Sequence, residues 1–298
     1  MSDRPIPRWA GIALLLVIAT TFGGNHIAAR IAFDHGSNVT TAVAFRSTGT
    51  ALIVLGLLLF NGISLRTSAK TFRQSILIGL LIAVQSYCLY SAVALIPVAL
   101  ALLVFQTFPM LLSLISWLGG GERPSRRVLL AMPVALFGLA LALDVYGKSG
   151  DVAGRWAEVG TGVLWALGAS ISFATAFYLI TRWLGAMDGR LRSFLFMSVV
   201  AVVTLAAGAA ANAFALPKDG TGWTALVLLM LFYGTAITST FVLLPKLGAV
   251  NNAAVLNFEP IAVLGLAWLI LGQAVAPLQI VGAFIVVGAI VWMGTAKR

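Results

Sequence analysis

Apolar residues along the chain fall into ten long runs that are separated by short polar junctions. A helix needs about 20 apolar residues to cross the hydrocarbon core of a bilayer, which is about 30 Å thick. Turn-forming residues such as Asn61 and Gly62 bound the runs. The pattern therefore predicts an all-α integral membrane protein with ten transmembrane helices. The runs cover residues 9–32, 40–60, 75–95, 98–118, 128–146, 158–181, 193–213, 223–244, 250–271 and 276–294.

Composition agrees with this pattern. Apolar residues make up 60% of the chain, charged residues only 9%, and the mean hydropathy is +1.02. A water-soluble protein has about a quarter of its residues charged, so membrane lipid must solvate much of this surface. The net charge of +10 does not indicate a nucleic-acid partner, because the basic residues form short clusters between apolar runs rather than a patch with interleaved aromatics.

The distribution of positive charge predicts the orientation. With the N-terminus placed inside, 14 of the 19 lysines and arginines fall in inner segments, four fall in outer segments, and Arg46 lies within a run. Inner segments of membrane proteins carry the excess of positive charge, so we expect a multi-pass inner-membrane protein with both termini in the cytoplasm. The first run has no A-x-A-like site, so we expect no cleavable signal peptide.

Two segments of the chain are related at a constant offset of 151. VFQTFPMLLSLISWLGGGE (104–122) and VLNFEPIAVLGLAWLILGQ (255–273) share five identical residues, which include a proline and a tryptophan. The chain therefore divides into two five-helix repeats, residues 1–147 and 158–298. Because five is odd, the second repeat must enter the membrane in the opposite sense. Inverted repeats of this kind are typical of secondary transporters, whose substrate cavity lies between the repeats.

These features resemble the EamA family of the drug/metabolite transporter superfamily. The resemblance is carried by Pro109, Trp117, Gly121 and Glu122, and by the segments GGNHIAAR, AFRSTGTAL and GVLWALGASISFATAFYLITR. It extends over essentially the whole chain, although Gln273 stands where the second repeat of the family usually has glutamate. The resemblance implies export of small metabolites. Within the family, the chain resembles bacterial aromatic amino-acid exporters.

Polar residues inside the apolar runs are candidates for the substrate site, because an unpaired polar group in lipid costs several kcal/mol. Asn25, His26 and Arg30 lie in the first run and Arg46 in the second. We expect them to form a cationic rim that faces the cavity. The alternatives are that Arg30 reaches the membrane interface, that Arg46 clamps helix carbonyls, and that His26 is a packed, hydrogen-bonded residue.

Glu259 is the acidic residue that lies most clearly inside the membrane, with Asn252 two turns earlier on the same face. It either binds a proton or forms an ion pair with Arg46 or His26. Gln106 has a similar depth in the first repeat. Pro109 and Pro260 are candidate hinges, since each frees the carbonyl four residues earlier, at Phe105 and Leu256. Such a carbonyl either lines the cavity or is bound by a neighbouring serine or threonine.

Aromatic residues complete the candidate site. Tyr90, Trp165, Tyr178 and Tyr233 lie in helices that line the central cavity in the EamA family. Tyrosine and tryptophan suit a flat amphipathic substrate or a cation, although aromatics that face lipid or pack helices are the alternative. We also expect four glycines to let helices approach closely, Gly79, Gly138, Gly282 and Gly288.

Together these residues favour a secondary transporter. The chain has no P-loop, so the energy must come from a gradient, for which a proton is one candidate. A cationic rim, a polar midplane and aromatic walls suit amino acids, exported by alternating access. Lipophilic cations, nucleobases and nucleotide sugars are the alternative substrates.

Other function classes fit the sequence less well. Two histidines, one cysteine and few acids supply no metal set and no Ser-His-Asp set, so we expect no metal, no cofactor and no enzyme activity. A channel would need rings of charge or a carbonyl filter. We expect the protein to be a monomer or a homodimer in lipid.

Overall fold

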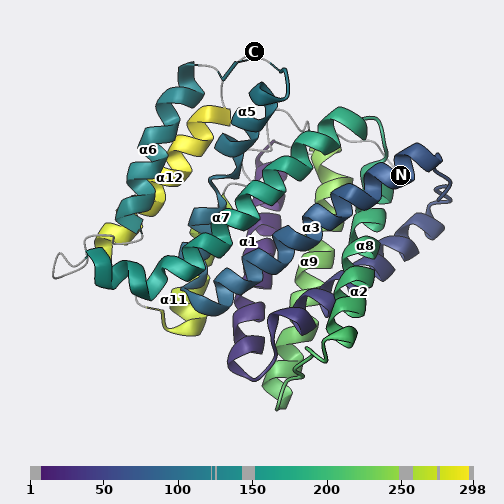
Figure 1. The fold of residues 1–298 in the computed structure, drawn as a ribbon, viewed down its shortest axis with the longest axis horizontal. Helices are drawn as coiled ribbons and strands as arrows, with labels where there is room; N and C mark the ends of the chain where they lie inside the picture. Colours follow the sequence, from purple (N-terminus) through teal and green to yellow (C-terminus); the bar gives the residue numbers. More distant parts are fainter. Residues whose placement is uncertain are drawn as a thin grey trace.

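The computed structural model describes residues 8–121, 123–124, 126–142, 152–247, 258–273 and 276–294. All regular elements in these residues are helices, which confirms the all-α prediction for this part of the chain. Figure 1 shows them as α1 (Arg8–Asp34), α2 (Val39–Phe60), α3 (Ala69–Leu95), α4 (Val98–Phe105), α5 (Phe108–Leu118), α6 (Arg126–Ala142), α7 (Val152–Trp183), α8 (Gly189–Ala210), α9 (Gly220–Leu247), α11 (Glu259–Leu271) and α12 (Pro277–Gly294).

The helices are long and apolar enough for a multi-pass membrane protein. Among the described residues, seven segments meet the length and hydropathy of a membrane span, and one of them is formed by α4 and α5 together. Three shorter apolar helices lie in the remaining predicted runs: Val128–Ala142, Glu259–Leu271 and Pro277–Trp292. Each of the ten runs therefore contains helix, while ten complete spans stay a prediction.

The sequence offset of 151 also relates the helix boundaries. Adding 151 to the first residues of α3, α5 and α6 gives the first residues of α9, α11 and α12. The packing follows the same relation. Helix α1 of the first repeat packs on α9 of the second. In the same way α7, the equivalent of α1, packs on α3, the equivalent of α9. Helices α2 and α8, which are also equivalent, pack on each other, as do α6 and α12.

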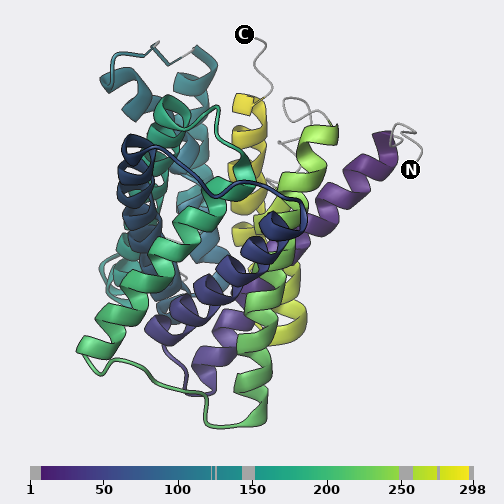
Figure 2. The same ribbon diagram turned by 90° about the vertical axis from the view of Figure 1, so that its right-hand side faces the viewer.

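The pair α6 and α12 lies at one end of the molecule, and the pair α2 and α8 lies at the other end (Figure 1). Helices α1, α3, α7 and α9 stand between these pairs (Figure 1), and α1 crosses α9 in the view of Figure 2. Helix α4 packs mainly against α7, α11 and α3, and every residue from Val98 to Val104 is buried. Its apolar side chains form much of the largest buried cluster.

Small residues bring the helices close together at three of the four predicted glycines. A Cβ atom at Gly79 would lie 2.6 Å from Val199 Cβ, and one at Gly282 would lie 2.5 Å from the carbonyl oxygen of Gly138. Gly138 is therefore part of the same contact between α6 and α12. The prediction for Gly288 is wrong, because no described atom outside its own helix backbone lies within 4 Å of the position of its Cβ and the residue is exposed.

The two repeats are also joined through connections outside the helices. His35 follows α1, Asp219 precedes α9, and His35 Nδ1 lies 2.6 Å from Asp219 Oδ2. The backbone N–H of Gly222 and the His35 imidazole hold the pKa of the Asp219 carboxyl below its ordinary value. We call this contact and its neighbours the loop junction. Its hydrogen bonds run from Asn38 Nδ2 to the Ala213 carbonyl, from the Ala215 N–H to Thr41 Oγ1 and from the Lys218 N–H to the His35 carbonyl.

Candidate functional site

Five helices bring a set of polar and aromatic side chains together in the interior. Asn25 and His26 come from α1, and both are buried, as is Arg46 of α2. Four of the sequence-predicted site residues thus meet in one place through Tyr90, which touches each of the other three. We call the whole set the polar cluster, and it consists of Asn25, His26, Arg46, Ser86, Tyr90, Tyr233 and Glu259.

Tyr90 of α3 is the centre of the polar cluster. Its hydroxyl donates a hydrogen bond to Asn25 Oδ1 at 2.8 Å. The centroid of its ring lies 4.9 Å from Cζ of Arg46 and 5.9 Å from the centroid of the His26 ring. The side chain is only 1% exposed, so its neighbours leave it little freedom to turn.

Arg46 lies between two tyrosine rings. Its Cζ atom is 4.1 Å from the ring centroid of Tyr233 of α9 and 4.9 Å from the ring centroid of Tyr90. Nη2 donates to Ser86 Oγ at 2.8 Å, while Nε is buried without a hydrogen-bond partner among the described residues. The faces of aromatic rings attract a cation but do not neutralise it. No carboxylate of the described residues forms an ion pair with this guanidinium.

Glu259 is bound by His26. It lies in the first turn of α11, where the positive end of the helix dipole favours a carboxylate. His26 Nε2 lies 3.3 Å from Glu259 Oε1, so α1 of the first repeat contacts α11 of the second. The sequence left a proton, Arg46 and His26 open as partners of Glu259, and in the structure the neighbour is His26. The Glu259 side chain remains 25% exposed, and no described lysine or arginine lies within 4.0 Å of it.

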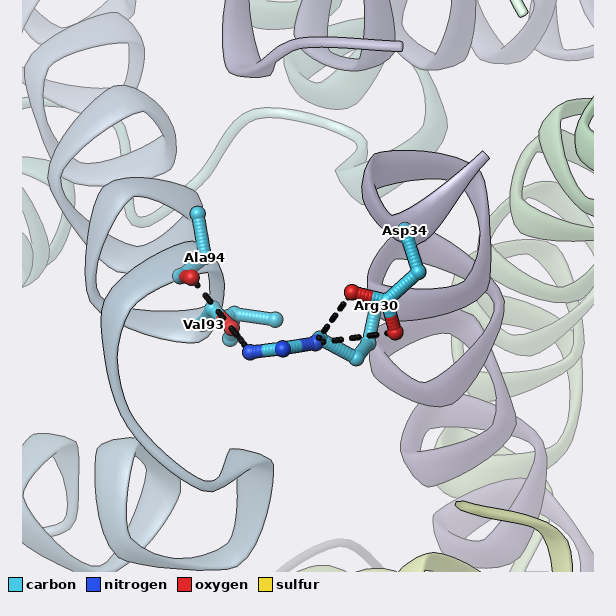
Figure 3. Close-up of polar contacts among 4 residues, drawn as sticks. All are labelled: Arg30, Asp34, Val93 and Ala94. Carbon is cyan, nitrogen blue, oxygen red and sulfur yellow. Dashed lines mark hydrogen bonds and ion pairs between the residues drawn. The ribbon is translucent and has the colours of Figure 1, made fainter. Parts of the chain in front are cut away.

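Arg30 does not join the polar cluster. Figure 3 shows its guanidinium reaching from α1 to the last turn of α3, where Nη1 donates to the carbonyls of Val93 and Ala94 at 3.3 Å each. Its Nε atom donates to Asp34, at 3.1 Å from Oδ1. Pro97 has no N–H, so the Val93 carbonyl cannot form the usual helical bond four residues onward. Arg30 replaces that bond, and the predicted cationic rim is therefore reduced to Arg46 and His26.

The other predicted site residues have neighbours outside the polar cluster. Trp165 is 38% exposed and packs edge-on against Tyr87, with 6.2 Å between ring centroids. Tyr178 donates to the Gly119 carbonyl at 3.1 Å and accepts a bond from Arg182 at 2.6 Å. Gln106 is buried directly after α4, and Asn252 lies outside the described residues.

The predicted hinge at Pro109 coincides with a break in the fourth span. Helix α4 ends at Phe105, and α5 begins at Phe108 with Pro109 in its first turn. The carbonyl of Phe105 accepts a hydrogen bond from Ser170 Oγ of α7 at 2.7 Å. The freed carbonyl is thus bound by a neighbouring serine, which is one of the two alternatives that the sequence left open. Pro260 has the equivalent place in the first turn of α11, and Leu256 lies outside the described residues.

Neither Ser86 nor Ser170 was among the candidate site residues, and the sequence placed Ser86 only on the same helix face as Tyr90. Ser86 stands four residues before Tyr90, so the two share a face of α3, and that spacing is the only signal for its role. Ser170 has no comparable signal. Serine in a membrane helix usually bonds to its own helix, and only the packing of α7 against α4 and α5 directs this hydroxyl to another one.

Comparison with known proteins agrees with the fold and with the repeat. A family model described as the EamA-like transporter family matches the chain twice, over residues 9–143 and 160–295. No curated protein gave a significant match. A protein of known crystal structure is similar with a TM-score of 0.63 over 95% of this chain and 97% of that one. At 19% sequence identity, this likeness shows a common fold alone.

Proposed function

The chain belongs to the EamA-like transporter family, and from that premise we propose that it exports amino acids across the bacterial inner membrane. The family is one of membrane transporters rather than enzymes. We further propose that the preferred substrates are aromatic or other bulky apolar amino acids.

One observation carries this proposal. The polar cluster holds a cation, Arg46, and an anion, Glu259, and these two groups do not form an ion pair with each other or with any other described arginine, lysine or carboxylate. Arg46 is buried without a carboxylate partner, and Glu259, whose side chain is 25% exposed, has only the His26 imidazole, so both groups favour a ligand that brings the opposite charge. An amino acid carries a carboxylate for Arg46 and an ammonium for Glu259. A zwitterion therefore complements both ends of the site.

The aromatic residues support the preference for a bulky side chain. Tyr233 flanks Arg46 on one side, and Phe22 packs edge-on against Tyr233 with 6.0 Å between ring centroids. Phe33 contacts Tyr90 in the same manner at 6.2 Å. Flat rings with polar tips bury an apolar side chain while they leave hydrogen-bonding groups for the charged end. Lipophilic cations fit less well because of Arg46, and nucleotide sugars would need more positive charge than one arginine.

Alternating access is supported by the repeats. The helix pairs α1–α9 and α7–α3 are equivalent. The two repeats can therefore exchange conformations, and this exchange opens the site first to one side of the membrane and then to the other. We place the hinges at Pro109 and Pro260, which begin the short helices α5 and α11. The threading is inverted, both termini are cytoplasmic, and a proton is the candidate coupling ion. The protein acts as a monomer or a homodimer in lipid.

Counterflow in proteoliposomes tests the proposal. Vesicles that contain the purified protein are loaded with unlabelled amino acid and given labelled phenylalanine, tyrosine, tryptophan or leucine. We expect accumulation of label, with half-saturation weakened roughly tenfold to a hundredfold in Arg46→Ala, because a hydrogen bond to a charged group contributes about 1.5–3 kcal/mol. Arg66→Ala is the matched control, since this arginine lies exposed between α2 and α3. Exchange of a nucleobase or a nucleotide sugar without exchange of any amino acid would overturn the proposal.

A further inference from the structure

We propose that His26 occupies the ammonium position on Glu259 in the empty transporter, so that only a substrate with an amino group displaces it. His26 then competes with the ammonium group of the substrate for this carboxylate. This inference rests on the proposed function. It goes further because it assigns the ammonium position to one contact between the repeats.

The geometry of the contact suits an exchangeable partner. His26 Nε2 lies 3.3 Å from Glu259 Oε1, which is longer than the distance of about 2.7–2.9 Å that is typical of a strong charge-assisted bond. His26 Nδ1 is buried without a hydrogen-bond partner among the described residues. An imidazole offers one N–H to the carboxylate in this position, whereas an ammonium group offers three and a full charge. The substrate is therefore the better ligand for Glu259.

No other group of the described residues takes this place. Among the titratable side chains near His26, Arg46 comes from α2, Tyr90 from α3 and Tyr233 from α9, while Glu259 comes from α11. Helix α4, which lies nearby, has no titratable residue. On α1 itself, Arg30 is bound to Asp34 and to the end of α3. Arg46 is thus the only other cation of the polar cluster, and it contacts Ser86 and the two rings rather than Glu259.

Substrate binding would keep the repeats connected. In the empty state, His26 of the first repeat holds Glu259 of the second. In the loaded state, the substrate connects Arg46 of the first repeat to Glu259 through its two charged groups. One link between the repeats replaces another, so the same groups that select the substrate also sense that it has arrived.

The exchange predicts a different effect on each class of ligand. An amino acid must displace His26 from Glu259, whereas a plain carboxylate can bind Arg46 and leave that contact intact. Removal of the imidazole should therefore strengthen binding of the amino acid and leave binding of the carboxylate unchanged.

The test compares an amino acid with its deamino analogue in the counterflow assay, phenylalanine and 3-phenylpropionate in the expected case. We expect wild-type protein to prefer phenylalanine. In His26→Ala the half-saturating concentration of phenylalanine should fall about twofold to tenfold, because a neutral hydrogen bond of about 0.5–1.5 kcal/mol no longer competes for Glu259, and competition by 3-phenylpropionate should be unchanged. His35→Ala is the matched control, because His35 is the other histidine of the chain and lies in the loop junction.

Two results would overturn the inference while leaving the proposed function intact. One is an unchanged half-saturating concentration of phenylalanine in His26→Ala. The other is an equal change for phenylalanine and for 3-phenylpropionate. If His26→Ala does not give folded protein, His26→Leu makes the same comparison. Absence of exchange of every amino acid in the wild type would instead count against the proposed function.

Discussion

Arg30 and Arg46 lie on neighbouring helices and have opposite environments. Arg30 is paired with Asp34 and binds two carbonyls, that of Ala94 and that of Val93, which Pro97 leaves without a helical partner. Arg46 has two tyrosine rings and a serine hydroxyl as neighbours. A cation that the protein has already neutralised contributes to the fold, while one that it has not neutralised is available to a ligand. The two arginines should therefore respond differently to substitution.

For Arg30→Gln we expect a loss of stability with transport retained. The substitution leaves the carbonyls of Val93 and Ala94 without their donor and Asp34 without its cation, which should cost about 1–3 kcal/mol. Thermal unfolding of the purified protein in detergent measures the effect, with Arg66→Gln as the exposed control. An unchanged midpoint together with lost counterflow would show that Arg30 serves the substrate and not the end of α3.

At the scale of single elements, close contact between backbones decides how the helices pack. In α12, Gly282 faces α6 so closely that a Cβ atom would lie 2.5 Å from the Ala142 nitrogen and from the Gly138 oxygen. Gly288 of the same helix has no atom within 4 Å of that position. The two glycines are six residues apart in one apolar helix. Substituting each of them by alanine therefore separates the effect of the close contact, present only at Gly282, from the effect of helix propensity, present at both.

We predict that Gly282→Ala destabilises the protein by about 1–3 kcal/mol, because the clash is with backbone atoms and the two helices must move apart. Gly288→Ala should be neutral or stabilising by up to about 1 kcal/mol, since alanine is the better helix former. Unfolding midpoints of the two variants under the same conditions measure the difference. Equal midpoints would contradict the close packing of α6 on α12.

At the scale of the whole molecule, the repeats are related but not identical. The loop junction joins the connection after α1 to the connection after α8. Their equivalents in the other repeat are residues 184–188 and 61–68, all of which the structure describes. No hydrogen bond or ion pair joins these two segments. Among the described residues, polar contacts therefore join the repeats at only one of these two equivalent places.

The loop junction should make stability depend on pH at the acidic end. The pKa of Asp219 is lowered in the folded state, so its contribution is present above the ordinary value of about 3.9 and is lost as the pH falls through the lowered pKa. We therefore expect the stability difference between wild type and Asp219→Asn to shrink from about pH 6 to about pH 3. His35→Gln should move this loss to higher pH. A constant difference over the range would contradict the ion pair.

Several features of this protein follow from its sequence by itself. Lipid requires apolar segments of a set length and makes each polar residue inside them costly, so the runs and their breakers could be located one by one. The offset of 151 predicted a repeat that reappears at the starts of α9, α11 and α12. For the same reason Asn25, His26, Arg46 and Glu259 could be selected as candidates from the pattern alone.

Only the tertiary structure decided which of these candidates meet. Helices that are apolar on most sides carry little information about their rotation, so the sequence does not determine which neighbour a side chain faces. Trp165 and Tyr178 were as suitable as Tyr90, yet only Tyr90 contacts Asn25, His26 and Arg46. The tilt and rotation of α1, α2, α3 and α11 bring His26 to Glu259 and place Arg46 against two tyrosine rings. Tilt and rotation depend on how whole helices pack against one another.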